Sequence, residues 1–377
     1  MSNELGVGIV GCGNISEAYM HLGPLFSDLK ILACADINRE AARAMADKHG
    51  LRADTVSELL VANDLDIIVN LTIPDVHFAV SRDILNAGKH VYSEKPLALT
   101  TADGLALKAL ADKKNLRVGC APDTFLGGAH QLARRTVDNG DVGKIIAGTC
   151  HVMNHGMEHW HPNPDFFYKV GGGPVLDIGP YYVANLINLI GPVARVGALT
   201  NATSPTRTIT SEPRSGETIP VDTPTNIHAL LEFKVGALVT LSASWDVWAH
   251  RHKPMELYGT EGSLYVPDPN FFGGEVLATR RGDEAEPVAT WDHPFSIPNQ
   301  EHASGKLANY RTAGLADMAR AIGQGRDHRC SLDRTLHGLE VMTAILQSGE
   351  EKRFVDLQTT CERPAALGIE EARSLLR

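Results

Sequence analysis

The sequence predicts an α/β protein with a doubly wound parallel sheet in its first third and a second, antiparallel sheet in the remainder. In the first 121 residues, unbroken apolar runs alternate with helical stretches, as in parallel sheets covered on both faces. Later runs alternate apolar and polar residues, which is typical of an antiparallel sheet with one buried face. The chain has 377 residues, more than the ~250–300 that usually share one core. We therefore expect two domains, residues 1–122 and residues 123–377.

The elements of the first domain follow from apolar runs and the glycines that end helices. Strands are expected at 4–10, 29–35, 66–71, 90–93 and 116–121. Helices are expected from Asn14 onward and over 39–49, 76–87 and 101–114. Gly50 and Gly88 follow two of these helices, where glycine is a usual C-terminal cap.

The second domain is predicted to contain a hairpin, further strands and two closing helices. Strands are expected at 144–153, 226–233, 237–245, 254–259, 263–266 and 275–279, and helices at 307–322 and 332–346. In 237–245, one face carries Val239, Leu241, Ala243 and Trp245, and the other carries Leu238, Thr240, Ser242 and Ser244. The stretch 200–223 is rich in Thr, Ser and Pro and is expected to be an exposed loop.

The composition excludes several classes of protein. A net charge of -10 with no basic run argues against a nucleic-acid or membrane-surface partner. No apolar run approaches the ~18–20 residues that cross a bilayer, and the N-terminus lacks the features of a signal peptide. The six cysteines are scattered and form no CxxC pair, which favours a reducing cytoplasm.

A glycine-rich turn between the first strand and helix predicts a dinucleotide site. Gly11 permits the turn, and Gly13 allows a pyrophosphate to approach the helix that begins at Asn14 and Ile15. Asp36 ends the second strand, where a carboxylate can bind the adenosine ribose. The alternative is a plain glycine turn with a surface aspartate.

Asp36 also favours NAD over NADP, because a carboxylate there repels a 2′-phosphate. Arg39 leaves NADP possible, since an arginine nearby can pair with that phosphate.

Two further strand ends are expected to contact the cofactor. Thr72 and Pro74, with His77 after them, follow the third strand, and Glu94 and Lys95 follow the fourth. In parallel sheets, cofactors bind at this carboxyl edge. A lysine beside a nicotinamide can bind a substrate hydroxyl and take part in proton transfer. Ordinary strand-end turns with surface residues are the alternative.

Taken together, these motifs resemble the glucose–fructose oxidoreductase / inositol dehydrogenase (Gfo/Idh/MocA) family. The segments Glu94-Lys95-Pro96, 171–179 (GGGPVLDIG) and 258–262 (YGTEG) are similar to motifs of that family. The resemblance implies a Rossmann domain followed by an α+β domain on a large open antiparallel sheet. It also implies a pyridine-nucleotide oxidoreductase that acts on a sugar, cyclitol or related polyol, and a homodimer or homotetramer assembled through the C-terminal sheet.

The family's catalytic residues carry over with one departure. Lys95 and Asp177 match, but the family's histidine four residues after the aspartate is Tyr181 here. Tyr181 can serve as the base if Lys95 stabilises its phenolate, or it can position substrate while a nearby histidine acts as base. A third reading makes Tyr181 and Tyr182 core aromatics.

Residues 154–164 hold the densest group of functional side chains. The H-x-x-E-H letters of 155–159 match a metalloprotease pattern, but glycine and prolines favour a loop, and no metal is expected. A substrate loop is favoured, with Trp160 stacking on a sugar ring and His155 or His161 bonding hydroxyls. A solvated loop is the alternative. Asp123 is a further substrate-binding candidate, and residues 245–252 are expected to shape the substrate pocket or a subunit contact.

The expected activity is therefore NAD-dependent hydride transfer to or from a hydroxyl-bearing carbon of a sugar or polyol. Two other readings stay open. One is an NAD-using glycosidase of the same fold, and the other is a non-catalytic nucleotide or sugar sensor.

Overall fold

The computed structural model describes residues 4–302 and 305–377, which form two compact units. The first unit comprises the chain up to Gly128 together with Asp292–Leu339 and Pro364–Arg377. The second comprises Ala129–Trp291 and Glu340–Arg363. The sequence prediction placed all residues after 122 in the second domain, whereas these compact units interleave along the chain. The physical reason is packing: Leu332, Leu336 and Leu339 join the core of the first unit.

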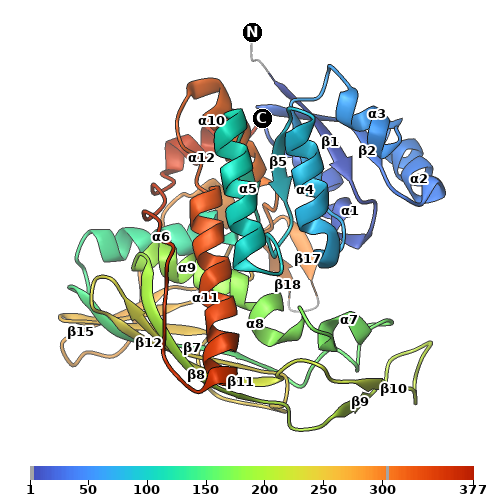
Figure 1. Ribbon diagram of the computed structural model, residues 1–377. Helices are drawn as coiled ribbons and strands as arrows, with labels where there is room; N and C mark the ends of the chain where they lie inside the picture. Colours follow the sequence, from blue (N-terminus) through green and yellow to red (C-terminus); the bar gives the residue numbers. More distant parts are fainter. Residues whose placement is uncertain (1–3, 303–304) are drawn as a thin grey trace. The chain divides into compact units, whose positions relative to one another are not determined.

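A six-stranded parallel sheet in the order β3-β2-β1-β4-β5-β6 forms the centre of the first unit (Figure 1). Its strands are β1 (Leu5–Val10), β2 (Leu29–Ala35), β3 (Arg52–Ala53), β4 (Ile67–Asn70), β5 (His90–Ser93) and β6 (Val118–Cys120). Every residue of β4 and β6 is buried, as expected for strands covered on both faces. The doubly wound parallel sheet is thus confirmed.

The helices of this unit either connect these strands or follow the last of them in the chain. They are α1 (Asn14–Leu22), α2 (Arg39–His49), α3 (Val56–Val61), α4 (His77–Asn86) and α5 (Thr101–Lys114), followed later in the chain by α10 (Ala313–Gln324) and α12 (Ile369–Leu375). The bounds of α2 match the prediction, because Asn38 caps its start and Gly50 closes it with φ 68°. The short helix α3 was not predicted. Helix α10 begins six residues later than predicted, after the strand pair β17 (Gln300–His302) and β18 (Gly305–Leu307).

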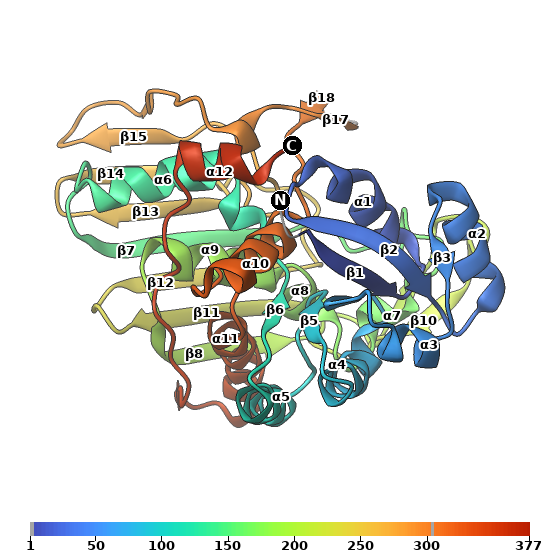
Figure 2. The same ribbon diagram turned by 90° about the horizontal axis from the view of Figure 1, so that it is seen from above.

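The second unit is built on a nine-stranded sheet in the order β16-β15-β14-β13-β7-β12-β11-β8-β19 (Figure 2). Its strands are β7 (Ile145–Met153), β8 (Val193–Asn201), β11 (Asn226–Phe233), β12 (Leu238–Ser244), β13 (Met255–Gly259), β14 (Gly262–Val266), β15 (Leu277–Arg280), β16 (Glu286–Pro287) and β19 (Val355–Asp356). The expected antiparallel sheet needs one correction, because β12 and β7 pair in parallel. These two strands are neighbours in the sheet but far apart in sequence, so no hairpin dictates their direction.

One face of this sheet is covered by helices and the other is not. The helices of this unit are α6 (Gly128–Asp138), α7 (Asp165–Tyr168), α8 (Gly173–Asp177), α9 (Gly179–Leu189) and the second part of α11 (Leu332–Glu351). In Figure 2, α6 and α9 overlie the strands, and their side chains share a core with those of the sheet. Burial alternates along β11, and its buried side chains join those of α9 in one large core.

The segment 200–223 differs from the exposed loop that was predicted. It forms a hairpin of β9 (Thr206–Thr208) and β10 (Thr218–Pro220). Ile209 and Ile219 are buried in a small second core with Tyr168 and Trp245. Composition suggested a loop because Thr, Ser and Pro dominate, but two isoleucines suffice to anchor the hairpin. In the part of the chain described, no helix is long and apolar enough to cross a membrane.

Candidate active site

The turn after β1 can be made only with glycine at position 11. Gly11 has φ 100°, a conformation that side chains disfavour. A Cβ atom there would lie 2.5 Å from the carbonyl oxygen of Leu71. Gly11 therefore allows β1 to turn tightly against the end of β4.

The next glycine is open to solvent. Gly13 precedes α1, and an added Cβ would meet nothing within 4 Å. No side chain in the described part of the chain caps this helix. Ser16 is buried, and its hydroxyl donates a hydrogen bond to the Gly13 carbonyl at 2.5 Å. This bond stabilises the turn on its buried side. The first N–H groups of a helix can bind a pyrophosphate, and a glycine before the helix allows the pyrophosphate to come close to them.

Asp36 lies at the end of β2, beside this turn. Its two carboxylate oxygens accept hydrogen bonds from the backbone N–H groups of Cys12, at 2.8 Å, and Asn38, at 2.7 Å. These bonds orient the half-exposed carboxylate next to the glycine turn. The adjacent Ile37 is 97% exposed, an unusual position for an apolar side chain. Sequence analysis missed Ile37, although its place directly after Asp36 could have indicated it. Arg39 is exposed at the first position of α2.

A buried histidine connects two strand-end loops at the same edge. The ring nitrogens of His77 lie 2.9 Å from the carbonyl oxygen of Thr72 and 2.7 Å from that of Pro96. The hydroxyl of Thr72 donates to the Asn70 side chain at 2.6 Å. His77 was predicted to bind cofactor, and the structure places it inside the protein, where it holds the loops of Thr72 and Lys95 together. Pro74 begins the short 3₁₀ turn between them, Pro74–Val76.

Glu94 is held from two sides, and Lys95 follows it. Tyr19 donates its hydroxyl to Glu94 at 2.9 Å, and the backbone N–H of Lys95 donates to the same carboxylate at 3.1 Å. Burial, and then the Glu94 charge, raise the pKa of the Tyr19 phenol. Lys95 is half-buried. The segment thus leaves β5 with a fixed backbone and a lysine at the carboxyl edge of the sheet.

Asp123 is buried within the first unit. Its carboxylate accepts the backbone N–H groups of Thr312, at 3.0 Å, and Gly314, at 2.9 Å, at the start of α10. Burial raises its pKa to about 6. These contacts explain why α10 begins where it does, since Asp123 binds the N–H groups that the helix leaves free. A substrate role for Asp123 stays a prediction.

In the second unit, a glycine run precedes the predicted catalytic aspartate. A Cβ at Gly172 would lie 2.4 Å from the Phe167 carbonyl oxygen, and Gly173 has φ 87°. Asp177 is the last residue of α8, and Tyr181 lies in the first turn of α9; both are half-exposed. Tyr182 is buried in the large core. Only one of the two tyrosines is therefore a core residue, and Tyr181 packs at the edge of that core.

The loop after β7 consists of turns, as predicted, and not of a helix. It divides the predicted substrate residues into two groups. The ring of His155 stacks on Trp248 with centroids 3.4 Å apart. Trp160 and His161 contact each other edge to face at 5.4 Å, and His161 also contacts Phe166. Among the residues described, no group of three potential metal ligands occurs.

A buried ion-pair network fixes this loop. Arg207 of β9 donates to Glu158 at 3.0 Å and also pairs with Asp246. The Tyr168 hydroxyl donates to the same Glu158 carboxylate. The Thr225 hydroxyl donates to Asp246 at 2.7 Å. Sequence analysis missed Arg207, because the hairpin that carries it was predicted to be an exposed loop.

Comparison with known protein families gives two matches that cover most of the chain. Residues 5–121 match an oxidoreductase family profile with an NAD-binding Rossmann fold. Residues 130–265 match the GFO/IDH/MocA C-terminal domain. The chain belongs to the Gfo/Idh/MocA family. The resemblance predicted from the sequence motifs is thus confirmed.

Relatives within this family include sugar dehydrogenases. The chain is 25% identical over 339 residues to a D-xylose dehydrogenase of Paenarthrobacter nicotinovorans, covering 85% of each protein. It is 25% identical over 292 residues to a levoglucosan dehydrogenase of Pseudarthrobacter phenanthrenivorans, covering 69% of this chain and 73% of that one.

Solved structures share the fold. An NAD-binding oxidoreductase from Klebsiella pneumoniae superposes with a TM-score of 0.79 at 21% identity, covering 94% of this chain and 99% of that one. A levoglucosan dehydrogenase in complex with NADH has a TM-score of 0.79 at 20% identity, covering 94% of this chain and 100% of that one. At this level of identity the similarity establishes the architecture.

Proposed function

We propose that this protein is an NAD-dependent dehydrogenase that moves a hydride between the nicotinamide and a hydroxyl-bearing carbon of a sugar or related polyol. The observation that carries the proposal is the turn after β1. Gly13 leaves the start of α1 bare, and Asp36 is oriented beside it by two backbone hydrogen bonds. The names of the D-xylose and levoglucosan dehydrogenase relatives support a sugar substrate.

The residues present fit a dinucleotide. The N–H groups of Asn14 and Ile15 suit the pyrophosphate, and Asp36 suits the ribose hydroxyls. The exposed Ile37 offers an apolar surface for the adenine. When bound, the nicotinamide supplies a hydride acceptor or donor, which no amino-acid side chain can replace.

Side chains of this protein are proposed to orient the reacting hydroxyl and to accept its proton. Lys95 is proposed to donate a hydrogen bond to that hydroxyl and to stabilise the alkoxide character that develops as hydride leaves the carbon. Asp177 is proposed to bind a hydroxyl group of the substrate. Tyr181 assists, either by taking the proton or by positioning the sugar. Trp160 and His161 offer an aromatic face and a hydrogen-bonding edge for the ring.

Cofactor choice tests the assignment of Asp36. We expect tighter binding of NAD than of NADP, and we expect Asp36→Ser to weaken NAD binding and narrow the difference. The measurement is a titration of both dinucleotides with wild type and variant. A wild-type preference for NADP of about tenfold or more, ~1.4 kcal/mol, would make the ribose assignment wrong.

The catalytic assignment is tested with a screen of sugars and cyclitols for NAD reduction, followed by variants. Lys95→Ala is expected to lower turnover about 10²–10⁴-fold while NAD affinity changes little, because that affinity comes from other residues. Lys113→Ala, an exposed lysine on α5, is the matched control. Near-normal turnover of Lys95→Ala would refute the assignment.

Tyr181→Phe separates the two roles left open for the phenol, and Tyr182→Phe controls for the loss of a nearby hydroxyl. Strongly reduced turnover with unchanged stability would place Tyr181 in proton transfer. Near-normal turnover would indicate a packing role and direct attention to His161. Substrate conversion with retained cofactor and no net NADH would instead favour the glycosidase reading.

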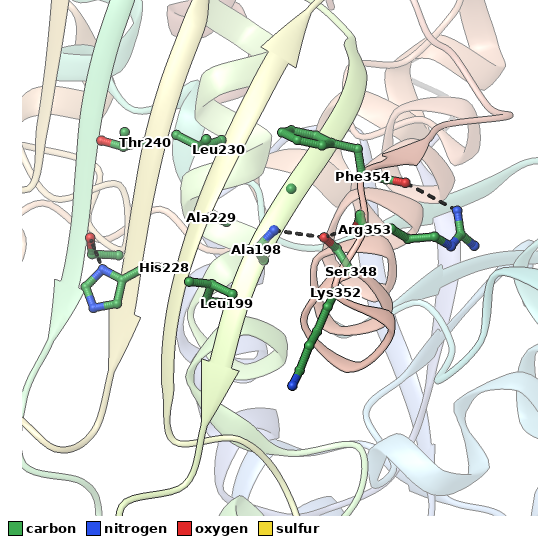
Figure 3. A pocket seen from close by; sticks show the side chains of 12 residues that line it. Ala198, Leu199, His228, Ala229, Leu230, Thr240, Ser348, Lys352, Arg353 and Phe354 are labelled. Atoms are coloured by element: carbon green, nitrogen blue, oxygen red, sulfur yellow. Dashed lines mark hydrogen bonds between the residues drawn. The ribbon is translucent and has the colours of Figure 1, made fainter.

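We further propose that two copies associate through the face of the nine-stranded sheet that the helices leave uncovered. Figure 3 shows Leu199, Leu230 and Phe354 around a hollow on this face. Leu199 is 72% exposed and Leu230 54%. An apolar surface of this kind on a sheet can pack on its twin about a two-fold axis. The predicted face of β12 is only partly open, since Leu238 and Thr240 are exposed but Ser242 and Ser244 are buried.

A further inference from the structure

A pocket of about 650 Å³ lies in the second unit, at the end of β7. This volume is within the range of small-molecule sites. Its walls come from three segments: the end of β7 with the loop after it, the β9–β10 hairpin, and the loop after β12. The side chains that line it include Asn154, His155, His159, Thr210, Trp248 and His250.

The pocket lies on the sheet face opposite to the large core, at the end of β7. It shares no lining residue with the hollow around Leu199, Leu230 and Phe354, through which two copies are proposed to associate. Val152 is buried in that core with side chains of α8 and α9. Met153 follows Val152 in the strand, so its side chain points to the other face, where it lines the pocket. The hairpin shows the same alternation: Ile209 is buried in the small core, whereas Thr208 and Thr210 are exposed and line the pocket. The pocket is therefore separate from the face that carries Asp177 and Tyr181.

The walls of the pocket are held rigid. Arg207 joins the hairpin to Glu158 of the loop after β7 and to Asp246 of the loop after β12. Main-chain bonds reinforce this, since the N–H of Thr210 donates to the Glu158 carbonyl at 2.9 Å and that of Val247 to the Asn154 carbonyl at 3.1 Å. A site whose walls are already ordered loses less entropy when a ligand binds.

The lining chemistry suits a neutral, hydroxylated ring. Trp248 is 82% exposed even though one side of its ring stacks on His155, so the indole offers an open apolar surface. Around it stand the hydroxyls of Thr208 and Thr210, the imidazoles of His159 and His250 and the amide of Asn154. The one carboxylate of the lining, Glu158, is already paired with Arg207. Hydrogen-bond donors and acceptors around an aromatic face match a sugar ring, which has an apolar C–H face and hydroxyl edges.

We propose that this pocket is a second carbohydrate site, which binds one neutral monosaccharide ring against Trp248. The site takes no part in hydride transfer. The proposal goes beyond the dehydrogenase function and does not depend on it, since binding here needs neither cofactor nor turnover.

The test is equilibrium dialysis of the full-length protein without cofactor, using radiolabelled D-xylose, D-glucose and levoglucosan as probes. We expect saturable binding of at least one probe. Trp248→Ala should weaken that binding at least about fivefold, the scale of a lost aromatic contact. Thr210→Val, which keeps the fold because the hydroxyl is exposed, should weaken it to a smaller extent. Trp160→Ala is the matched control and should leave it unchanged.

The test is completed by steady-state kinetics with the sugar that the enzyme oxidises. Trp248→Ala and Thr210→Val are expected to keep the wild-type kcat and KM, whereas Trp160→Ala should raise KM. Three results would each overturn the proposal: no probe binds up to its solubility limit, binding survives both pocket variants, or the pocket variants raise KM as Trp160→Ala does. The last result would assign the pocket to the oxidised substrate. Failure of turnover in every variant and in wild type would refute the dehydrogenase function but leave the binding result standing.

Discussion

The two glycines of the turn after β1 should respond in opposite ways to the same substitution. Gly11→Ala and Gly13→Ala each add one methyl group, two residues apart. At Gly11 the methyl group meets the Leu71 carbonyl at 2.5 Å and the backbone has φ 100°. At Gly13 the methyl group meets nothing, and φ is -83°, which any residue adopts. The first substitution should therefore affect the fold, and the second should affect only what binds there.

The magnitudes follow from these environments. For Gly11→Ala, a positive φ costs roughly 1–2 kcal/mol and forced overpacking typically about 1–3 kcal/mol. We expect a loss of about 2–5 kcal/mol in the free energy of unfolding. For Gly13→Ala, the lost preference for glycine at the helix start and the reduced entropy of the unfolded chain nearly cancel, so stability should stay within about 1 kcal/mol of wild type. NAD affinity should nevertheless fall by about tenfold or more, ~1.4 kcal/mol, because the methyl group occupies the approach to the helix start.

Urea unfolding measures the first quantity, and calorimetric titration with NAD measures the second. Gly50→Ala is the control for backbone conformation, since Gly50 has φ 68° with open space around it and lies away from the site. It should lose about 1–2 kcal/mol of stability and no NAD affinity. Wild-type NAD affinity in Gly13→Ala would show that the pyrophosphate does not lie over Gly13, and the proposed cofactor site would be wrong.

Three further predictions concern the rest of the molecule. Arg207→Met should lower the free energy of unfolding, measured by urea titration, by about 3–5 kcal/mol, because two buried carboxylates lose their partner. Arg195→Met, which breaks an exposed pair, should leave the free energy of unfolding nearly unchanged. Burial lowers the pKa of His130 from 6.5 to about 4, so its stabilising contribution of up to ~3 kcal/mol is complete above pH 6.5 and disappears as the pH falls toward 4. Urea midpoints between pH 7.5 and 4.5 should show this, and His130→Gln should flatten the dependence; an equal slope in both proteins would contradict it. In sedimentation at micromolar concentration, Leu230→Glu should convert the dimer to a monomer. Val235→Glu, in the turn between β11 and β12, should leave the dimer intact. A wild-type protein that is monomeric would refute the association.

The first unit illustrates how far local sequence determines structure. Helix α2 is bounded by Asn38 and Gly50, whose effects act within one helical turn. Strands β2 and β5 have the predicted bounds, and the last three residues of each are buried in the parallel sheet. The glycine turn and Asp36 were also predictable, since their roles depend on residues adjacent in the chain.

Other features depend on partners that are remote in sequence. The parallel pairing of β12 with β7 joins strands almost a hundred residues apart, and no local pattern specifies such a direction. The hairpin of β9 and β10 depends on Ile209 and Ile219 reaching Tyr168 and Trp245. Arg207, on this hairpin, forms ion pairs with Glu158 and Asp246 only because folding brings these three residues together.

The loop after β7 combines features that depend on neighbouring residues with features that depend on remote ones. Its sequence predicted turns and a group of side chains able to bind a sugar, and the turns are confirmed. The separation of His155 from Trp160 and His161 could not be predicted, because it depends on the stacking of His155 on Trp248. Trp248 lies in the loop after β12, more than ninety residues later in the chain. Local sequence thus accounts for the glycine turn and for most strands and helices of the first unit, whose causes act over a few residues. Which side chains share a site depends on the folded chain, because those contacts join segments that are remote in sequence.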